Sequence, residues 1–383
     1  MAVMADISTA VRPFRIAIPD EDLAELRNRL HRTRWPEREC VGDWSQGIPL
    51  EYTRELAGYW ADDYDWRVRE ARLNTFDQFV TEIDGLDIHF IHQRSADPEA
   101  FPLIITHGWP GSIVEFTNVI GPLSENFHVV CPTLPGYGFS GKPTATGWTV
   151  ERIAAAWDIL MTRLGYRHYG AQGGDWGAAV TTQIGRDKGH CVAIHTNMPI
   201  AMPPGPLDDP TPEEQDALAA AGHYQRWDSG YARQQSTRPQ TLGYGLADSP
   251  AGQLAWIMEK FWSWTDCDGH PENVLSRDDL LDNVMMYWVT NSAASSARLY
   301  WESFTSFGGG AKVQVPTGVA RFPKEILRAP RNWCEAAYTI THWTDMPRGG
   351  HFAAFEQPEA FVADVRTFFG TFLRRFPGGR TAV

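Results

Sequence analysis

The chain has 383 residues, 43% of them hydrophobic and 21% charged, an ordinary globular composition with room for one large domain and additions to it. A formal net charge of −13 argues against nucleic acid as a partner, because phosphate binding needs a basic face. No stretch approaches the roughly 20 apolar residues that span a bilayer, and residues 1–13 lack the apolar run of a signal peptide. We therefore expect no membrane partner.

The five cysteines are an odd number with no close spacing, so neither a zinc site nor a redox pair is predicted. A reducing cytoplasm fits this cysteine usage best. The chain also lacks a His-Glu-x-x-His motif and a phosphate-binding glycine loop. We accordingly expect neither a metal nor an organic cofactor.

The first predicted elements form an N-terminal arm and a hairpin. Within residues 14–32 three leucines recur at helical spacing, and Asp20 is placed to cap that helix. The other predicted elements of this region are a helix at about 50–60 and strands at 79–83 and 86–92. The two strands flank Asp84-Gly85, a dipeptide typical of a two-residue hairpin turn, so the hairpin marks the entry to a sheet.

From here short apolar strands alternate with helices. The predicted strands are 103–106, 129–131, 167–172 and 191–195, and the helices are 150–164 and a second one after the glycine turn that follows residue 172. Such alternation predicts a mainly parallel sheet with helices on both faces.

Residues 200 to about 310 interrupt this alternation. They are rich in proline, glycine and aromatic residues, with helical stretches predicted at 211–221, 250–263 and 278–304. The segment is too long for a loop, and we interpret it as an inserted helical cap. The alternation resumes with strands at 312–319 and 337–341 and a last helix at 356–374. The predicted division is an N-terminal arm with the first hairpin (1–95), a first core part (96–200), the cap (201–310) and a second core part (311–383).

The sharpest motif surrounds Asp175. Residues 173–177 have the spacing Gly-x-Asp-x-Gly, which is the nucleophile elbow with aspartate where esterases place serine. Residue 175 must adopt a strained turn between strand and helix, while Gly173 and Gly177 let the two elements approach closely. The helix dipole favours an ionised carboxylate at this position, and such a carboxylate is a usable nucleophile.

An ordinary Gly-Asp turn is the alternative reading of this motif. The same tripeptide recurs at residues 42–44, where no apolar strand precedes it, and we expect Asp43 to be a surface or capping residue. A carboxylate that attacks an ester would give an unproductive anhydride. Attack on an sp³ carbon gives a stable alkyl ester, so Asp175 predicts an epoxide or an alkyl halide as substrate.

Residues 107–112 (His-Gly-Trp-Pro-Gly-Ser) follow a buried strand, where the hydrolase fold places its oxyanion loop. We expect the backbone N–H groups of Trp109 and Trp176 to hold the oxyanion. Pro110 is expected to form a cis bond. His107 is expected to be a structural histidine that bonds the loop, because it is misplaced for a general base. His107, Pro110 and Trp288 are also placed at the substrate pocket.

The general base should follow the last strand, and His351 in Gly-Gly-His-Phe does so just before the final helix. A capping histidine is the alternative role. Glu325 follows the preceding strand and is expected to orient the imidazole, with Asp345 as the second choice. The alternative is that Glu325 is an ordinary surface residue. His342 lies on the last strand itself and is expected to be a core or supporting residue.

Together these motifs resemble the microsomal-type epoxide hydrolase family. The similarity covers nearly the whole chain and rests on residues 107–110, 174–177, 322–325 and 349–352. The resemblance implies an α/β-hydrolase fold with a helical cap and an N-terminal meander, here without a membrane anchor, as in a soluble bacterial enzyme. It also implies two lid tyrosines, Tyr231 and Tyr300, with Tyr224 and Tyr244 as neighbours that compete for the first role. A phenol stays protonated at neutral pH and can donate to the epoxide oxygen.

The expected function is hydrolysis of a hydrophobic epoxide, with an aryl epoxide as the suggested type, to a vicinal diol, in detoxification or natural-product biosynthesis. Haloalkane dehalogenase is the nearest alternative, and a non-catalytic binding protein on the same fold is a more distant one. The expected partners are the epoxide, water and, as a homodimer, a second copy of the chain. A bulky substrate is suggested by aromatic residues of the cap: Trp256, Phe261, Trp262, Trp264, Trp288 and Trp301.

Overall fold

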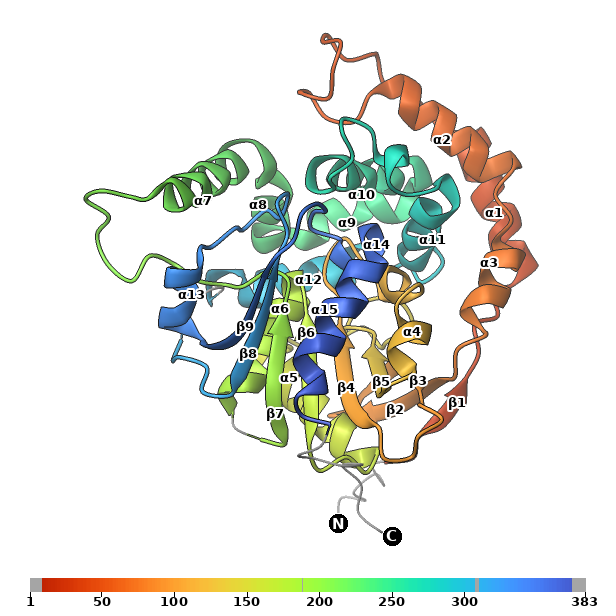
Figure 1. Ribbon diagram of the computed structural model, residues 1–383. Helices are drawn as coiled ribbons and strands as arrows, with labels where there is room; N and C mark the ends of the chain where they lie inside the picture. The colour runs from red at the N-terminus through yellow and green to blue at the C-terminus, as the bar shows by residue number, and fades with distance from the viewer. Residues whose placement is uncertain (1–8, 188, 307–309, 374–383) are drawn as a thin grey trace.

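A computed structural model describes residues 9–187, 189–306 and 310–373, and within these residues the core is one nine-stranded sheet (Figure 1). The strands are β1 (Arg12–Phe14), β2 (Gln78–Ile83), β3 (Leu86–Gln93), β4 (Phe101–Thr106), β5 (Phe127–Pro132), β6 (Tyr169–Gly173), β7 (Cys191–Thr196), β8 (Pro316–Arg321) and β9 (Thr339–Asp345). Their order is β1-β2-β3-β5-β4-β6-β7-β8-β9. Neighbours from β5 to β9 pair in parallel, while β1, β2 and β3 add an antiparallel edge. The predicted fold class is confirmed.

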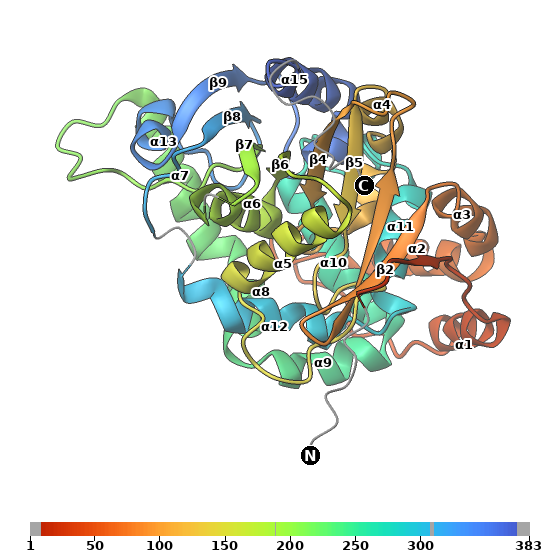
Figure 2. The same cartoon turned by 90° about the horizontal axis from the view of Figure 1, so that it is seen from below.

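The helices of the core are α4 (Ile120–Ser124), α5 (Val150–Arg163), α6 (Asp175–Asp187), α13 (Arg331–Ala337), α14 (Ala353–Glu356) and α15 (Pro358–Gly370), with the short 3₁₀ turn η1 (Ile113–Phe116). Helices α4 and α15 cover one face of the sheet, and α5 and α6 cover the other (Figure 2). Strands β4 and β5 are buried along their whole length. Their unbroken apolar sequences reflect this two-sided cover.

The predicted hairpin is confirmed. Asp84 and Gly85 both have positive φ angles, 52° and 78°, and connect β2 directly to β3. This backbone twist matches the right-handed twist of the paired strands, which is why an Asp-Gly pair is favoured there.

Three helices precede the hairpin: α1 (Asp20–His31), α2 (Leu50–Asp62) and α3 (Trp66–Leu73). They run along one side of the molecule from β1 to the cap (Figure 1). Asp20 does not cap α1, since Pro19 holds the cap position without a side-chain bond and Asp20 pairs with Arg67 instead. Helix α3 was not predicted, because its charged sequence carries little amphipathic pattern.

The cap lies over the carboxyl ends of the parallel strands (Figure 1). Its helices are α7 (Pro212–His223), α8 (Gly230–Thr237), α9 (Pro239–Asp248), α10 (Pro250–Trp264), α11 (Arg277–Trp288) and α12 (Ala293–Ser303), with the short turns η2 (Tyr224–Asp228), η3 (Pro271–Asn273) and η4 (Phe304–Ser306). The single helix predicted at 278–304 is wrong, because Asn291 takes a left-handed conformation, with φ of 48°, and separates α11 from α12.

Two predictions for the C-terminal region also need correction. The strand expected at 312–319 is β8, which begins only at Pro316. The helix expected at 356–374 is divided between α14 and α15 before Pro358, whose ring removes a backbone N–H donor. Its last residue, Arg374, lies outside the described residues.

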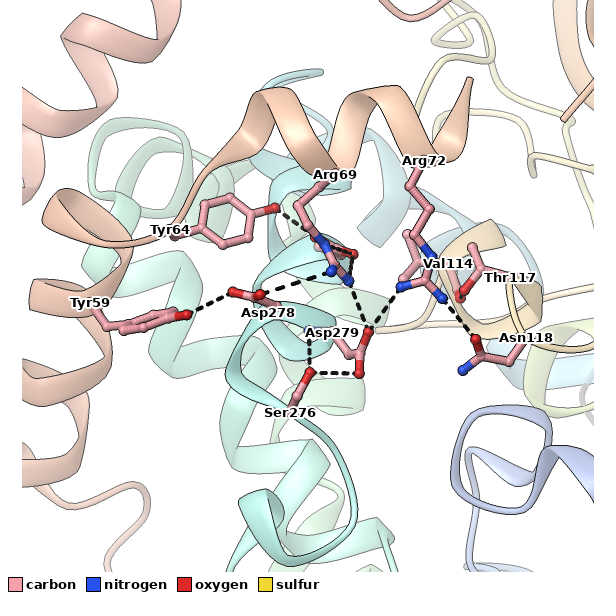
Figure 3. Close-up of polar contacts among 11 residues, drawn as sticks. Tyr59, Tyr64, Arg69, Arg72, Val114, Thr117, Asn118, Ser276, Asp278 and Asp279 are labelled. Atoms are coloured by element: carbon pink, nitrogen blue, oxygen red, sulfur yellow. Dashed lines mark hydrogen bonds and ion pairs between the residues drawn. The ribbon is translucent and has the colours of Figure 1, made fainter. Parts of the chain in front are cut away.

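An arginine on α3 joins the N-terminal helices to the cap (Figure 3). Arg69 donates to both carboxylate oxygens of Asp282, at 2.6–2.9 Å, and to Asp279 at 2.9 Å. Tyr64 donates to the same Asp282 at 2.7 Å. Arg72 reaches Asn118 of the core at 2.8 Å, so α3 is bonded both to α11 and to the segment after η1. In the part of the chain that the structure describes, no helix is long and apolar enough to cross a membrane.

Candidate active site

The turn between β6 and α6 places Asp175 at the carboxyl edge of the sheet. Asp175 has a φ of 51°, the left-handed strain expected of an elbow. A side chain at Gly173 would come within 2.1 Å of the Gly177 carbonyl oxygen. One at Gly177 would come within 1.9 Å of the Thr106 carbonyl oxygen. Glycine is therefore required at both positions for the helix to pack this closely, as the motif predicted.

The loop after β4 holds one oxygen of Asp175. The backbone N–H of Trp109 donates to Asp175 Oδ1 at 2.7 Å, and the Trp109–Pro110 bond is cis. Helix α11 fixes this loop from above: Asn283 donates to the Pro110 carbonyl at 2.7 Å, and Tyr287 donates to the Gly111 carbonyl at 2.6 Å. No sequence motif indicated these two supporting residues, which lie 173 and 176 positions from the loop residues that they bind.

His107 has the structural place expected of it. Its Nδ1 bonds the Gly108 carbonyl at 3.0 Å, and its Nε2 accepts the Leu134 N–H at 3.1 Å. Burial lowers the pKa of His107 to about 4, so the ring is neutral. Trp176 follows Asp175 in the first turn of α6, and its indole packs edge-on against Tyr300 with ring centres 4.8 Å apart.

His351 lies between two carboxylates. Its Nε2 is 3.4 Å from Asp175 Oδ2, and its Nδ1 is 2.6 Å from Glu325 Oε1. Burial alone would lower the pKa of His351, but Glu325 and Asp175 together raise it well above its ordinary value. The structure thus brings together the three residues that the sequence singled out as nucleophile, base and orienting acid.

Asp345, the second choice for the orienting acid, and His342, the histidine on the last strand, have other partners. Asp345 is exposed and pairs with Arg321 at 2.5 Å. His342, half-buried on β9, bonds Asp364 of α15 at 2.9 Å, so it contacts that helix, and the supporting role stays a prediction.

A buried glutamate holds the turn that carries His351, and sequence reasoning missed it. Glu356 accepts backbone N–H groups from Asp266 at 2.8 Å, Gly350 at 3.0 Å and Phe352 at 3.1 Å. Burial raises the pKa of Glu356 to about 7 despite these bonds. The His351 N–H donates to the Trp264 carbonyl at 2.8 Å, so the cap helix α10 also fixes the turn.

Tyr231 on α8 and Tyr300 on α12 reach the same site from the cap. Their rings lie edge-on to each other with centres 5.6 Å apart, and Tyr231 stacks on Trp109 at 4.7 Å. Burial, with the Asp175 charge among the further causes, raises the pKa of both phenols well above the ordinary value, so both remain protonated. Tyr224 bonds the Tyr231 hydroxyl at 3.0 Å, whereas Tyr244 is 70% exposed and lines a different pocket, together with Arg29 and Lys142.

Two spaces adjoin these residues. A small cavity is lined by Asp175, His351, His107 and Trp109, among others. A pocket of about 1020 Å³ opens between residues 43–47 and the cap, and Tyr231 forms part of its wall. Its aromatic lining is Trp44, Trp227, Trp256 and Trp262. Pro110 and Trp288, expected at the substrate pocket, line neither of these two spaces, and Trp288 ends α11 as a half-buried side chain.

The sheet order, the elbow and the inserted cap define an α/β-hydrolase. Comparison with known proteins agrees: a family model described as "alpha/beta hydrolase fold" matches residues 102–247, and one described as "Epoxide hydrolase N terminus" matches residues 11–116.

Similar proteins indicate which kind of α/β-hydrolase the chain is. A protein from Stigmatella aurantiaca, whose own naming as an epoxide hydrolase is provisional, is 51% identical over 94% of this chain and 84% of that protein. Epoxide hydrolase 1 of Oryctolagus cuniculus is 35% identical over 94% of this chain and 89% of that protein. The solved structure of Aspergillus niger epoxide hydrolase has a TM-score of 0.88 and 34% identity, covering 96% of this chain and 98% of that one.

The chain therefore belongs to the epoxide hydrolase family, and it is a hydrolase that acts on epoxides. Family membership decides between the alternatives that the sequence left open, in favour of epoxide hydrolysis over dehalogenation or binding alone.

Proposed function

We propose that the chain converts a hydrophobic epoxide to a vicinal diol through a covalent ester on Asp175. The observation that carries this proposal is the continuous contact Asp175–His351–Glu325, at 3.4 and 2.6 Å, beneath two buried phenols. Asp175 Oδ2 attacks an epoxide carbon while Tyr231 and Tyr300 donate to the opening oxygen. Asp175 Oδ1 keeps its hydrogen bond from the Trp109 N–H and becomes the ester carbonyl oxygen.

Hydrolysis of the ester is the second step. Ester formation removes the Asp175 charge, which is one of the two influences that raise the pKa of His351. The imidazolium then gives up its proton more readily, to the tyrosinate that ring opening leaves, and the neutral ring can activate water while Glu325 keeps Nδ1 in place. Attack of that water on the ester carbonyl places charge on Oδ1, where the Trp109 N–H and, in our proposal, the Trp176 N–H stabilise it.

The substrate that this architecture favours is bulky and apolar. This proposal rests on the pocket beside Tyr231, which four tryptophans line. Aryl or long alkyl epoxides are therefore the proposed class, while the choice between detoxification and biosynthesis stays a prediction, as does a homodimer. All five cysteines are free, which supports the proposed reducing, cytoplasmic setting.

We also propose that the chain divides at residues 95, 200 and 310 into arm, core, cap and second core part. Helices α7 to α12 fall between β7 and β8, which supports the two cap boundaries. Residues 1–8, 188, 307–309 and 374–383 of this division lie outside the described ranges.

The covalent route is tested by a single turnover in heavy-oxygen water. The first diol should carry ordinary oxygen from Asp175, and the label should appear in the carboxylate instead. His351→Gln should trap the ester, seen as a protein mass increase equal to the whole epoxide, with turnover lower by about 10²–10⁴-fold. His31→Gln, on exposed α1, is the matched control. Immediate labelling of the first diol would refute the ester, and full turnover by His351→Gln would remove His351 from the reaction.

A further inference from the structure

A carboxyl group that the proposed reaction does not use lies beside its two central residues. Glu115 is on η1, directly after the oxyanion loop, and its side chain lines the same small cavity as Asp175 and His351. The sequence offered no motif for Glu115, because a single acid after Gly-Ser is unremarkable without its three-dimensional neighbours.

The backbone on both sides of Glu115 is held by hydrogen bonds. Ser112 caps η1 by accepting the Val114 N–H at 3.2 Å, and its hydroxyl donates to Asn283 at 2.8 Å. A side chain at Gly111 would lie 1.4 Å from Glu115 Oε1, so the carboxyl group rests against the loop backbone. Thr117 and the Arg72–Asn118 bond tie down the end of the same segment (Figure 3).

The cavity has room for the hydrolytic water. The space open to the centre of a water molecule measures about 20 Å³. One water molecule requires roughly 10–15 Å³ of such space. A water bounded by Asp175, His351 and Glu115 would have polar partners on three sides.

The charge of Glu115 depends on the state of Asp175. Burial is the main cause that raises the pKa of Glu115 to about 8; His351 lowers it, while Asp175 and Glu356 raise it. The other titratable groups that feel the Glu115 charge, Cys131 and Tyr287, are buried and neutral. At neutral pH the free enzyme therefore holds a protonated Glu115. Ester formation removes the Asp175 charge, and Glu115 then ionises more easily.

We propose that Glu115 is a positioning residue for ester hydrolysis, orienting the attacking water and stabilising the His351 imidazolium; this inference rests on the proposed covalent route. The water oxygen bonds to the Asp175 ester carbon, one water proton passes to His351 Nε2, and the second stays hydrogen-bonded to Glu115. The tetrahedral species then collapses: the bond to the diol oxygen breaks and that oxygen takes the proton from His351. The carboxylic acid formed at Asp175 passes the second water proton to His351 Nε2, 3.4 Å away in the free enzyme, and the Asp175 carboxylate is restored.

The test is Glu115→Gln, with the two half-reactions measured separately by rapid mixing. At pH 7 glutamine resembles the neutral acid, so the rate of ester formation should be unchanged. Ester hydrolysis should slow by about tenfold or more, as expected for a lost hydrogen bond to a charged group, and the ester should accumulate. Without the neighbouring anion, the His351 imidazolium in the ester form is less stable. The acid limb of the pH–rate profile, which is the pH range in which the rate of ester hydrolysis falls as His351 becomes protonated, should therefore move to lower pH.

Three comparisons keep the outcomes separate. Glu125→Gln, an exposed acid paired with Arg366, should leave both steps unchanged. Glu115→Asp keeps the charge but shortens the side chain, and should retain the acid limb while slowing hydrolysis. Should Glu115→Gln fold poorly, ester formation by Glu115→Asp still reports an intact site. Ester hydrolysis at the wild-type rate and pH profile in Glu115→Gln would overturn this inference alone, whereas absence of any ester in the wild type would overturn the proposed function.

Discussion

The two lid tyrosines are the residues whose contribution can be isolated with least disturbance. Tyr300→Phe removes one hydroxyl but keeps the ring that packs against Trp176 at 4.8 Å. Because burial holds the phenol protonated, its loss should slow ester formation by about 10²-fold without slowing ester hydrolysis. Pre-steady-state measurement of the protein mass increase would follow the first step directly.

Tyr244→Phe is the matched control, since its exposed ring lies outside the site. Tyr231→Phe should also slow ester formation, and the double variant with Tyr300→Phe should be slower than either single one. An unchanged rate of ester formation in the double variant would show that neither hydroxyl assists ring opening.

The central residues of the site could be predicted because each lies in a short local motif with its own conformational demand. Gly173, Asp175 and Gly177 are an example: the sequence spacing reflects contacts of the backbone with itself. Glu115 and Glu356 could not be predicted, because each faces groups that are distant in the sequence: Glu115 shares a cavity with Asp175 and His351, and Glu356 accepts the Asp266 N–H. A single acid in the sequence gives no sign of the cavity or the backbone N–H groups that it faces.

At the scale of elements, α3 links the N-terminal helices to the cap through one arginine. Arg69→Ala would leave Asp282, whose side chain is only 5% exposed, buried without its cation. Loss of one partner of such a pair should lower the free energy of unfolding by about 3–5 kcal/mol at neutral pH. Urea denaturation of the variant and the wild type measures this difference.

The pH dependence of that loss identifies its cause. Burial already raises the pKa of Asp282, and removal of Arg69 should raise it further. Protonation then relieves the unpaired charge, so the loss should be smaller at pH 5 than at pH 8. Arg12→Ala breaks an exposed pair with Asp87 and should cost less than about 1 kcal/mol. Equal losses of unfolding free energy in the two variants would mean that the Arg69–Asp282 pair contributes no more than a surface pair.

The elements themselves were predicted where local pattern and tertiary structure agree. The hairpin at residues 84–85 and the buried strands β4 and β5 belong to this group. Helix α3 escaped prediction because ion pairs with another helix stabilise it, rather than an apolar stripe. The break at Asn291 also escaped, since asparagine occurs inside helices as well, and the sequence alone does not show that this one takes a left-handed conformation.

At the scale of the whole molecule, one aspartate ties the C-terminal helix to the far side of the sheet. Asp364 on α15 accepts hydrogen bonds from His195 on β7 at 2.9 Å, and from His342 and Thr344 on β9 at 2.9 and 2.6 Å. Burial would raise the pKa of Asp364, but these bonds outweigh it and hold the pKa well below the usual range. The carboxylate therefore stabilises the fold only while it is ionised.

The sign of the pH effect follows from this depressed pKa. The unfolded chain takes up a proton at Asp364 near pH ~4, whereas the folded chain does so only at lower pH. The contribution to stability is thus complete above pH ~4 and declines as the pH falls below it. Asp364→Asn should lower the free energy of unfolding at pH 7, and the difference from the wild type should shrink in acid. Asp63→Asn, on the exposed end of α2, should show neither effect. A loss of stability in Asp364→Asn that stays constant from neutral pH into acid would mean that packing of the side chain, rather than its charge, joins α15 to the sheet.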